Sequence, residues 1–349
     1  MEDIKMKIEK RFIALAGTAL ILAISCGNAY KIDIPHYDYE QEEEEISLPV
    51  TPDPDAPKVP TLNDPTGKWM TEKLDNGLIL YTFRGYDDVS NANQIVNVLE
   101  VNLSDPRYAI KFVYSAQGTT NSNAVKAEPT AIAGINAGYE PEAIYIKINN
   151  AILSNVKLQP GHLRYWKHEA CIFSEGERTV GILYGGKDGE KAIEAYNSLE
   201  ASNIIASAPM LVNDYDPIGE DFIGGTFTDE QLNQFDYEDY RRHQGVRHPR
   251  TVYALTEDND LLLIAIDGRW SGAAEGMNAA EVTRFIVKYF NPQWAINMDG
   301  GGSTTLTVKG LGHPDTGVVN YPTDGGTHDH TGERSVSTHV LVLYDEDAK

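Results

Sequence analysis

The stretch Asn297-Met298-Asp299-Gly300-Gly301-Gly302-Ser303-Thr304-Thr305 combines features that packing alone does not explain. It follows the short apolar run 294–296, which is typical of a buried strand. A carboxylate at the strand end precedes three glycines, each of which costs roughly 0.5–1 kcal/mol relative to alanine inside a regular element. Such a run commonly brings backbone N–H groups close to an anionic ligand, often a phosphate. The alternative is a tight turn between strands without a ligand.

A helix is predicted directly before this stretch. Asn278 and Glu281 have the spacing of a capping box, here with asparagine as the N-cap. Apolar residues follow with helical spacing at 282, 285, 286 and 289, and Asn291-Pro292 ends the pattern. The segment 187–199 is a second candidate helix. The other predicted elements are strands.

The predicted helix lies between two predicted strands, 261–266 and 294–298. If these strands run parallel in one sheet, their carboxyl ends meet at the same edge, where ligands of parallel strands usually bind. The first strand ends in Asp267-Gly268-Arg269 and the second in Asp299-Gly300-Gly301. Two carboxylates and a guanidinium would then meet at one site. Two solvated Asp-Gly turns are the alternative interpretation.

Composition and charge restrict the class of protein. The 349 residues are 41% hydrophobic and 23% charged, as in ordinary globular proteins. Asp and Glu total 52 against 29 Lys and Arg, which gives a net charge of −23. This balance argues against nucleic-acid binding, which needs a basic face. An anionic substrate would have to be bound by a few local arginines.

The first residues have the pattern of an export signal. Four basic residues between Lys5 and Arg11 precede the apolar run 12–24, which is too short to span a membrane as a helix. The run ends in Leu22-Ala23-Ile24-Ser25-Cys26, which resembles a bacterial lipobox. We therefore expect residues 1–25 to be a lipoprotein signal peptide and Cys26 to carry the lipid. Ordinary signal cleavage is the alternative. The sequence therefore predicts an exported bacterial lipoprotein that is anchored to a membrane and lies in the periplasm or on the cell surface.

The segment 26–65 is predicted to be an acidic, proline-rich tether. It contains the run 42–45 of four glutamates, and nine acidic residues but no Lys or Arg between 33 and 57. Such a segment cannot bury enough apolar surface to offset its ordering entropy. No second linker and no internal repeat follows, so 66–349 is predicted to be one domain. Frequent strands with period-two alternation predict an α+β fold with mixed, largely antiparallel sheets, few helices and the strand–helix–strand unit carrying the site.

From residue 131 to 342 the chain carries a series of short blocks: Gly134-Ile135-Asn136-Ala137-Gly138-Tyr139, Ala208-Pro209-Met210-Leu211-Val212, Arg247-His248-Pro249-Arg250-Thr251, Asp267-Gly268-Arg269, Gly276-Met277, the glycine stretch 297–305, Asn320-Tyr321-Pro322-Thr323-Asp324-Gly325 and Gly332-Glu333-Arg334-Ser335-Val336. In this order they resemble the blocks of the phosphodiester glycosidase family. The family usually has phenylalanine where this chain has Glu140, and a glycine where it has Ala208; the acidic, aromatic insertion 214–244 is a further departure.

The resemblance implies hydrolysis of a sugar-1-phosphodiester at the anomeric carbon, which releases the free sugar, N-acetylglucosamine being one candidate, and a phosphomonoester. Carboxylates would activate water, act as nucleophile or stabilise an oxocarbenium-like centre, and arginines would bind phosphate bidentately. The implied substrate is a phosphodiester-linked glycan; no protein partner is inferred. Candidate catalytic residues are Asp267, Asp299 and Glu275; phosphate-binding residues are Arg250, Arg269, Arg334, Gly301, Gly302, Ser303 and Thr304; sugar-binding residues are Asn136 and Asn320. A surface salt bridge is the alternative role for Arg334.

Other chemistries fit less well. The chain lacks a G-x-S-x-G nucleophile elbow and a P-loop, and no cofactor is expected. His328 and His330 stand two apart in a polar loop, where histidines are more often solvated than metal-bound, so no metal is expected. The competing function is a cell-surface lipoprotein that binds glycans without cleaving them. The insertion 214–244 suits either function, whereas a binder that only stacks sugars would not need Asp267, Asp299 and Arg250.

Overall fold

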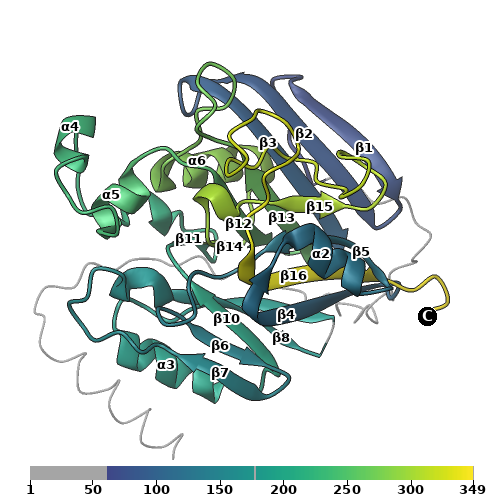
Figure 1. The fold of residues 1–349 in the computed structure, drawn as a ribbon, viewed down its shortest axis with the longest axis horizontal. Coiled ribbons are helices and arrows are strands. Elements are labelled where there is room, and N and C mark those ends of the chain that lie inside the picture. The colour runs from purple at the N-terminus through teal and green to yellow at the C-terminus, as the bar shows by residue number, and fades with distance from the viewer. Residues whose placement is uncertain (1–60, 177, 349) are drawn as a thin grey trace, which may run out of the picture. The chain divides into compact units, whose positions relative to one another are not determined.

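The computed structural model of this chain describes residues 61–176 and 178–348, which form one compact unit. Within them, three sheets carry the fold, and all neighbouring strands run antiparallel (Figure 1). The predicted α+β class, with largely antiparallel sheets and few helices, is confirmed. The predicted signal peptide, Cys26 as the expected lipid site, and the predicted tether up to residue 60 lie outside the described residues. None of the described helices is both long and apolar enough to cross a bilayer.

The largest sheet has seven strands and the other two have five and four. In spatial order the seven are β1 (Trp69–Asp75), β2 (Leu78–Asp87), β3 (Ala92–Asn102), β13 (Asp260–Ile266), β12 (Arg250–Leu255), β14 (Trp294–Asn297) and β11 (Met210–Asn213). The five are β7 (Ala151–Asn155), β6 (Tyr145–Ile148), β10 (Asn203–Ser207), β8 (Ala170–Glu175) and β9 (Thr179–Tyr184). The four are β15 (Leu306–Val308), β5 (Ala131–Asn136), β16 (Val336–Tyr344) and β4 (Tyr108–Thr119).

The helices are few and mostly short. They are α2 (Asn121–Ala127), α3 (Gly189–Ser198), α4 (Asp229–Leu232), α5 (Tyr240–Gly245) and α6 (Ala279–Phe290), with 3₁₀ turns η1 (Tyr165–His168), η2 (Ile218–Asp221) and η3 (Gly301–Ser303). The capping box predicted at Asn278 and Glu281 is present, and Asn291 ends α6 in the left-handed conformation. The second candidate helix is α3.

The seven-stranded sheet is the central layer, because both of its faces are covered. Alternate side chains of β13, such as Leu261 and Leu263, join one core with the two smaller sheets. Their neighbours Leu262 and Ile264 face the opposite side, where α6 packs its apolar stripe. Each such buried side chain contributes about 1.5–3 kcal/mol relative to exposure. The continuous apolar run of β13 is the consequence of this double burial.

The predicted strand–helix–strand unit is present, but a further strand, β12, lies between its two strands in the sheet. Strands β13 and β14 both pair antiparallel to β12, which lies between them, so they run parallel to each other. Helix α6 makes the connection. The carboxyl ends of β13 and β14 therefore lie at the same edge of the sheet, and this edge positions the glycine stretch.

Two parts of the fold differ from the predictions. Of the five-stranded sheet only β6 lies within a strand that the sequence predicts, 143–148, because the other four strands lack a clear alternation of apolar and polar residues. Residues 61–65, assigned to the tether, are bound to the domain: the Asn63 N–H donates to the Tyr289 carbonyl at 2.8 Å, and Asp64 accepts from three backbone N–H groups. The folded unit therefore begins before residue 66.

Candidate active site

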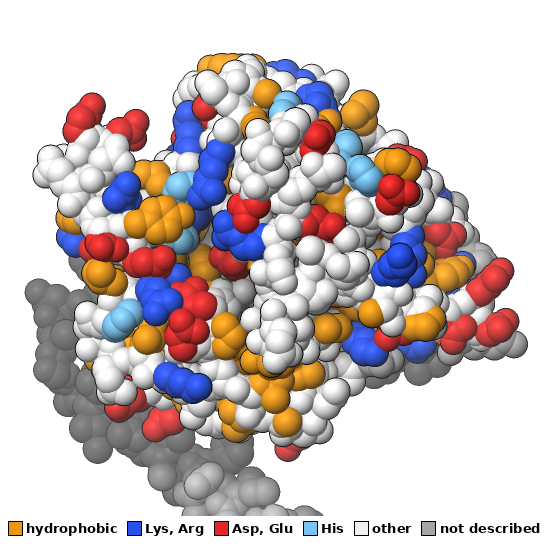
Figure 2. All heavy atoms as spheres, in the orientation of Figure 1, with side chains coloured by type: hydrophobic (Ala, Val, Ile, Leu, Met, Phe, Trp, Pro, Cys, Tyr) orange, Lys and Arg blue, Asp and Glu red, His pale blue; other side chains and the backbone are white. Residues whose placement is uncertain are grey.

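A cavity of about 450 Å³ opens where the glycine stretch leaves the sheet edge. In the view of Figure 2, basic, acidic and histidine side chains gather between α5 and the sheet that contains β6 and β10. Segments far apart in the sequence meet at this place. The cavity is lined by residues 138–141, Lys167, 237–238, His243, His248, Arg250, Arg269, 299–303 and 334–337.

A side chain at each of the three glycines would be unfavourable for a different reason. A Cβ at Gly300 would lie 2.5 Å from the Pro249 carbonyl oxygen, and Gly301 has a φ of +61°, which favours glycine. A Cβ at Gly302 would lie 2.0 Å from Asp324 Oδ1. The Gly301 N–H already donates to the Pro249 carbonyl at 2.8 Å, so it is not free to bind phosphate. The glycines hold the loop tightly against its neighbours and keep the cavity floor open.

Of the three predicted catalytic carboxylates, Asp299 is the one that lines the cavity. Burial raises its pKa to about 6, although the neighbouring Ser303 hydroxyl opposes the rise. Ser303 Oγ is buried beside this carboxylate and forms no other hydrogen bond among the described residues. The backbone at Asp299 is fixed from both sides: its N–H donates to the Ala137 carbonyl, and its carbonyl accepts from Asn136 Nδ2 at 2.7 Å.

Arg269 is the cation best placed to meet an anionic ligand. It is exposed, lines the cavity and forms no ion pair among the described residues. Its Nη2 lies 3.3 Å from His248 Nδ1 and 3.4 Å from the Tyr237 hydroxyl. Arg334 also lines the cavity, but it forms a bidentate ion pair with Asp324 at 2.7 and 2.9 Å. A phosphate would meet one unpaired guanidinium and one that is already neutralised.

Arg250 has a mainly architectural position. It is 1% exposed, and its guanidinium donates to the carbonyl groups of Met277, His243 and Val246 and to Gln244 Oε1. No carboxylate of residues 61–176 and 178–348 forms an ion pair with Arg250, and burial lowers its pKa to about 10. Four of its five N–H groups are thereby used within the protein. Arg250 brings positive charge to the cavity wall and ties α5 to β12, but it has little capacity left to bind phosphate directly.

The remaining predicted residues lie outside the cavity lining. Asp267 is 1% exposed; its Oδ1 accepts from Asn320 Nδ2 and the Tyr321 N–H, and its Oδ2 has no hydrogen-bond partner among the described residues. Burial raises the pKa of Asp267 to about 7. Glu275 accepts from the Gly272 N–H. The geometry thus places Asp267 and Asn320 together behind the glycine stretch, as supports rather than as groups that face a ligand.

Asn136 and Thr304 are supports as well. Asn136 Oδ1 accepts from the Thr251 hydroxyl and the Thr305 N–H, so both ends of the amide are engaged. Thr304 Oγ1 accepts from the same Thr251 hydroxyl at 3.2 Å. Asn136 is 1% exposed and does not line the cavity, so its predicted sugar-binding role finds no support in the geometry. Its observed contacts orient the loop that carries Asp299.

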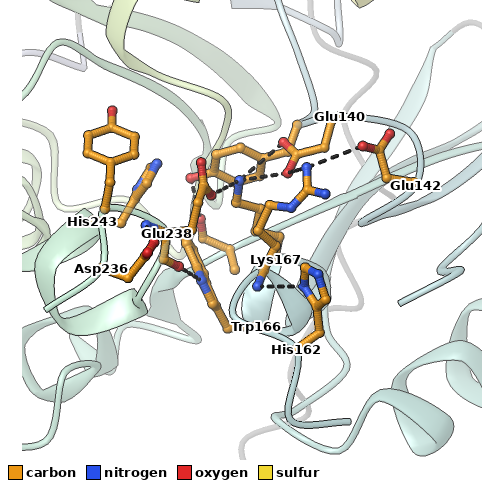
Figure 3. Close-up of polar contacts among 12 residues, drawn as sticks. Glu140, Glu142, His162, Trp166, Lys167, Asp236, Glu238 and His243 are labelled. Carbon is orange, nitrogen blue, oxygen red and sulfur yellow. Dashed lines mark hydrogen bonds and ion pairs between the residues drawn. The ribbon is translucent and has the colours of Figure 1, made fainter. Parts of the chain in front are cut away.

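Three charged residues of the cavity were not singled out as site residues. The Lys167 amine is 2% exposed and lies between Glu140, at 2.9 Å, and Glu238, at 2.8 Å (Figure 3). Burial raises the pKa of Glu140, but the Lys167 and Arg164 cations outweigh it and hold the pKa below its usual range. Glu140 had been noted only as a departure from the family pattern. The charged side chain of Glu140, at a position where the family usually has phenylalanine, is the feature of the sequence that could have indicated this cluster.

Two histidines complete the wall opposite Asp299. Burial and the cations of Arg250 and Arg269 lower the pKa of His248 to about 3, and similar causes lower that of His243 well below its usual value. Both rings are therefore neutral at neutral pH. Because an arginine N–H only donates, His248 Nδ1 accepts from Arg269, and the ring proton resides on Nε2.

The described residues contain no group of three or more His, Cys, Asp or Glu side chains arranged to hold a metal ion. His328 stacks against Tyr321 and Trp270, and His330 Nδ1 bonds to the Asn320 carbonyl. These histidines therefore belong to an aromatic cluster beside Asp267.

The sequence was also compared with known protein families. The phosphodiester glycosidase family matches residues 129–343 of this chain. The chain belongs to the phosphodiester glycosidase family. A search of curated proteins finds no match.

Two solved structures share the fold. One is the catalytic domain of zebrafish N-acetylglucosamine-1-phosphodiester alpha-N-acetylglucosaminidase, auto-inhibited by its pro-peptide: 16% identity and a TM-score of 0.51, over 81% of this chain and 86% of the other. The other is a hypothetical protein from Synechocystis: 11% identity and a TM-score of 0.50, over 79% of this chain and 64% of the other. At these identities the similarity shows the fold alone.

Proposed function

We propose that this protein hydrolyses a sugar-1-phosphodiester at the anomeric carbon and releases the free sugar and a phosphomonoester. The observation that carries the proposal is the cavity in which Asp299 faces the same space as the unpaired guanidinium of Arg269. The membership of the family supports the class of reaction. N-acetylglucosamine is the first sugar to test, because the name of the zebrafish relative contains it.

Arg269 and Ser303 suit the phosphate. Since the chain carries a net charge of −23, long-range electrostatics repel a phosphodiester, and binding depends on short-range contacts. A guanidinium binds two phosphate oxygens in its fixed fork, and the Ser303 hydroxyl supplies a further donor. The positive charge of Arg269 then stabilises the transition state more than the bound substrate, because negative charge develops on the leaving phosphate.

Asp299 suits the anomeric carbon. Glycosidases place a carboxylate there as nucleophile, as base for water or as partner of an oxocarbenium-like centre. A phosphomonoester is a good leaving group, so the reaction does not need a strong general acid. This agrees with Glu140, whose ion pairs with Lys167 and Arg164 keep it ionised and unable to donate a proton.

We further propose export and lipid attachment at Cys26, which places the enzyme at the membrane of a bacterial cell. The basic start, the short apolar run and the lipobox-like residues before Cys26 support this. A glycan polymer with phosphodiester links at the cell surface is a substrate within reach of such an enzyme.

The test is release of reducing sugar from a panel of sugar-1-phosphodiesters that vary in the sugar. The Asp299→Asn variant should lose on the order of a hundredfold in turnover, and Glu275→Gln, a carboxylate outside the cavity, is the matched control. Binding of a panel member without turnover by the wild type would instead support the non-catalytic glycan-binding lipoprotein.

A further inference from the structure

One hydroxyl group at the cavity has no role in the proposed function. Tyr237 lines the cavity together with Asp299 and Arg269, and it is 43% exposed, so a ligand can reach it. The residue lies in the loop between α4 and α5, within the insertion 214–244. The family resemblance assigns no site residue to this insertion. Tyr237 is therefore a side chain that this chain adds to the site.

Contacts on both sides of Tyr237 fix its backbone, although it lies in a loop. Before it, the Phe235 carbonyl accepts a hydrogen bond from Arg242 Nη1 at 3.0 Å. After it, the Glu238 carbonyl accepts from Trp166 Nε1 at 3.0 Å (Figure 3). A loop held in this way loses little further freedom when a ligand binds, which favours binding.

The ring of Tyr237 is held by two histidine rings of the same cavity. Its centroid lies 5.4 Å from that of His243 and 6.0 Å from that of His248, and both contacts are edge to face. Edge-to-face contacts are a favourable arrangement of aromatic rings. The two histidines therefore fix the direction in which the ring carries its hydroxyl group.

The hydroxyl proton of Tyr237 is available to a ligand. Arg269 Nη2 lies 3.4 Å from the Tyr237 hydroxyl oxygen. An arginine N–H only donates, so the phenol oxygen is the acceptor in this contact. Within residues 61–176 and 178–348, no group accepts a hydrogen bond from this hydroxyl. The phenol can thus accept from Arg269 and donate to a third group at the same time.

The charges around the hydroxyl favour an anion as this third group. Arg269 is in contact with it, and the guanidinium groups of Arg250 and Arg334 lie within electrostatic range of Tyr237. Two donors that are 3.4 Å apart can both reach one oxygen atom at about 2.8 Å. A phosphate oxygen bound to Arg269 therefore lies within reach of the Tyr237 hydroxyl.

We propose that Tyr237 is a further catalytic residue, whose hydroxyl donates a hydrogen bond to a non-bridging oxygen of the substrate's phosphate. The proposal rests on the proposed function. When the bond between the anomeric carbon and the phosphate oxygen breaks, its electron pair stays on the phosphate, and water supplies the new hydroxyl group of the sugar. The hydrogen bond from Tyr237 becomes stronger as this charge develops. Tyr237 keeps its own proton throughout.

The Tyr237→Phe variant tests the proposal, because it removes the hydroxyl and keeps the ring. On a sugar-1-phosphodiester its kcat/KM should fall about tenfold or more, mainly through kcat, as expected for a hydrogen bond to a charged group that strengthens in the transition state. Tyr215→Phe is the matched control, since Tyr215 lies in the same insertion, is 41% exposed and does not line the cavity. Its kcat/KM should stay within about twofold of the wild type.

The Arg269→Ala background separates a direct contact with phosphate from mere orientation of Arg269. If the hydroxyl touches the phosphate, Tyr237→Phe should still lower the single-turnover rate about threefold or more in this background, with enzyme in excess. A loss that disappears without Arg269 would show that Tyr237 only orients the guanidinium. That result, or an unchanged kcat/KM in Tyr237→Phe alone, would overturn the proposal.

Calorimetric binding of inorganic phosphate distinguishes failure of this proposal from failure of the proposed function. If no diester is cleaved, the proposed function fails. The phosphate contact then stands if inorganic phosphate binds to the wild type and Tyr237→Phe weakens this binding about threefold or more. Absence of phosphate binding to the wild type, or equal binding by the two proteins, would refute the contact.

Discussion

Replacement of Asp267 by asparagine tests whether this carboxyl is a support, as the structure places it, or a catalytic group, as the sequence suggested. Burial raises the pKa of Asp267 from 3.8 to about 7. A buried carboxyl of this kind binds its proton more tightly in the folded than in the unfolded state. Its contribution to stability is therefore complete below pH 4 and is lost as the pH rises through 7.

The size of the effect follows from the two pKa values. Between pH 4 and 7 this group should reduce the free energy of unfolding by about 1.4 kcal/mol per pH unit, and by about 4 kcal/mol in all. Asparagine has no such titration. It leaves one amide donor without a partner at the place of Oδ2, which costs about 1–3 kcal/mol at every pH. The variant should be the less stable protein at pH 4, where the wild-type carboxyl has lost little of its contribution, and should equal or exceed the wild type at pH 8.

Urea unfolding of both proteins from pH 4 to 8 measures the difference, in which the titrations of other groups cancel. We also expect the variant to keep turnover within about tenfold at pH 6, because Asp267 touches no part of the cavity. Parallel stability profiles would show that the carboxyl is not buried as described. A loss of turnover by a hundredfold with the fold intact would return Asp267 to the catalytic residues.

Four further results are expected. Wild-type kcat/KM should fall as the pH decreases below about 6, because the Asp299 carboxylate becomes protonated, and a flat profile from pH 4.5 to 8 would contradict its role. Arg269→Ala should weaken hydrolysis of phosphodiesters more than Arg269→Lys does, with an aryl glycoside much less affected; equal losses on both substrates would mean that this arginine holds the fold or the sugar. Gly300→Ala should lower the Tm by several degrees, since its Cβ would lie 2.5 Å from the backbone carbonyl oxygen of Pro249, whereas Gly225→Ala, with its nearest neighbour at 3.5 Å, should not. Cys26→Ser should abolish labelling by a fatty-acid probe, and persistent labelling would exclude this cysteine as the lipid site.

The sequence by itself determined the elements whose signals are local. The capping box at Asn278 and the apolar stripe of α6 are encoded within one helix, and the run at β14 is recognisable because the strand is buried on both faces. The glycines after Asp299 marked a place of close backbone approach. Each of these signals needs only neighbouring residues, so each could be read in order along the chain.

Only the tertiary structure decided which side chains meet. Parallel strand ends brought Asp267 and Asp299 to one edge, but their side chains occupy different environments there, one packed behind the glycine stretch and one at the cavity. The ion pairs of Lys167 with Glu140 and Glu238 join residues 27 and 71 positions apart, and no local pattern encodes such contacts. Burial, charge and pKa depend on these distant neighbours, which is why the sequence predicted that the ends of β13 and β14 meet at one sheet edge but not which side chains face the cavity.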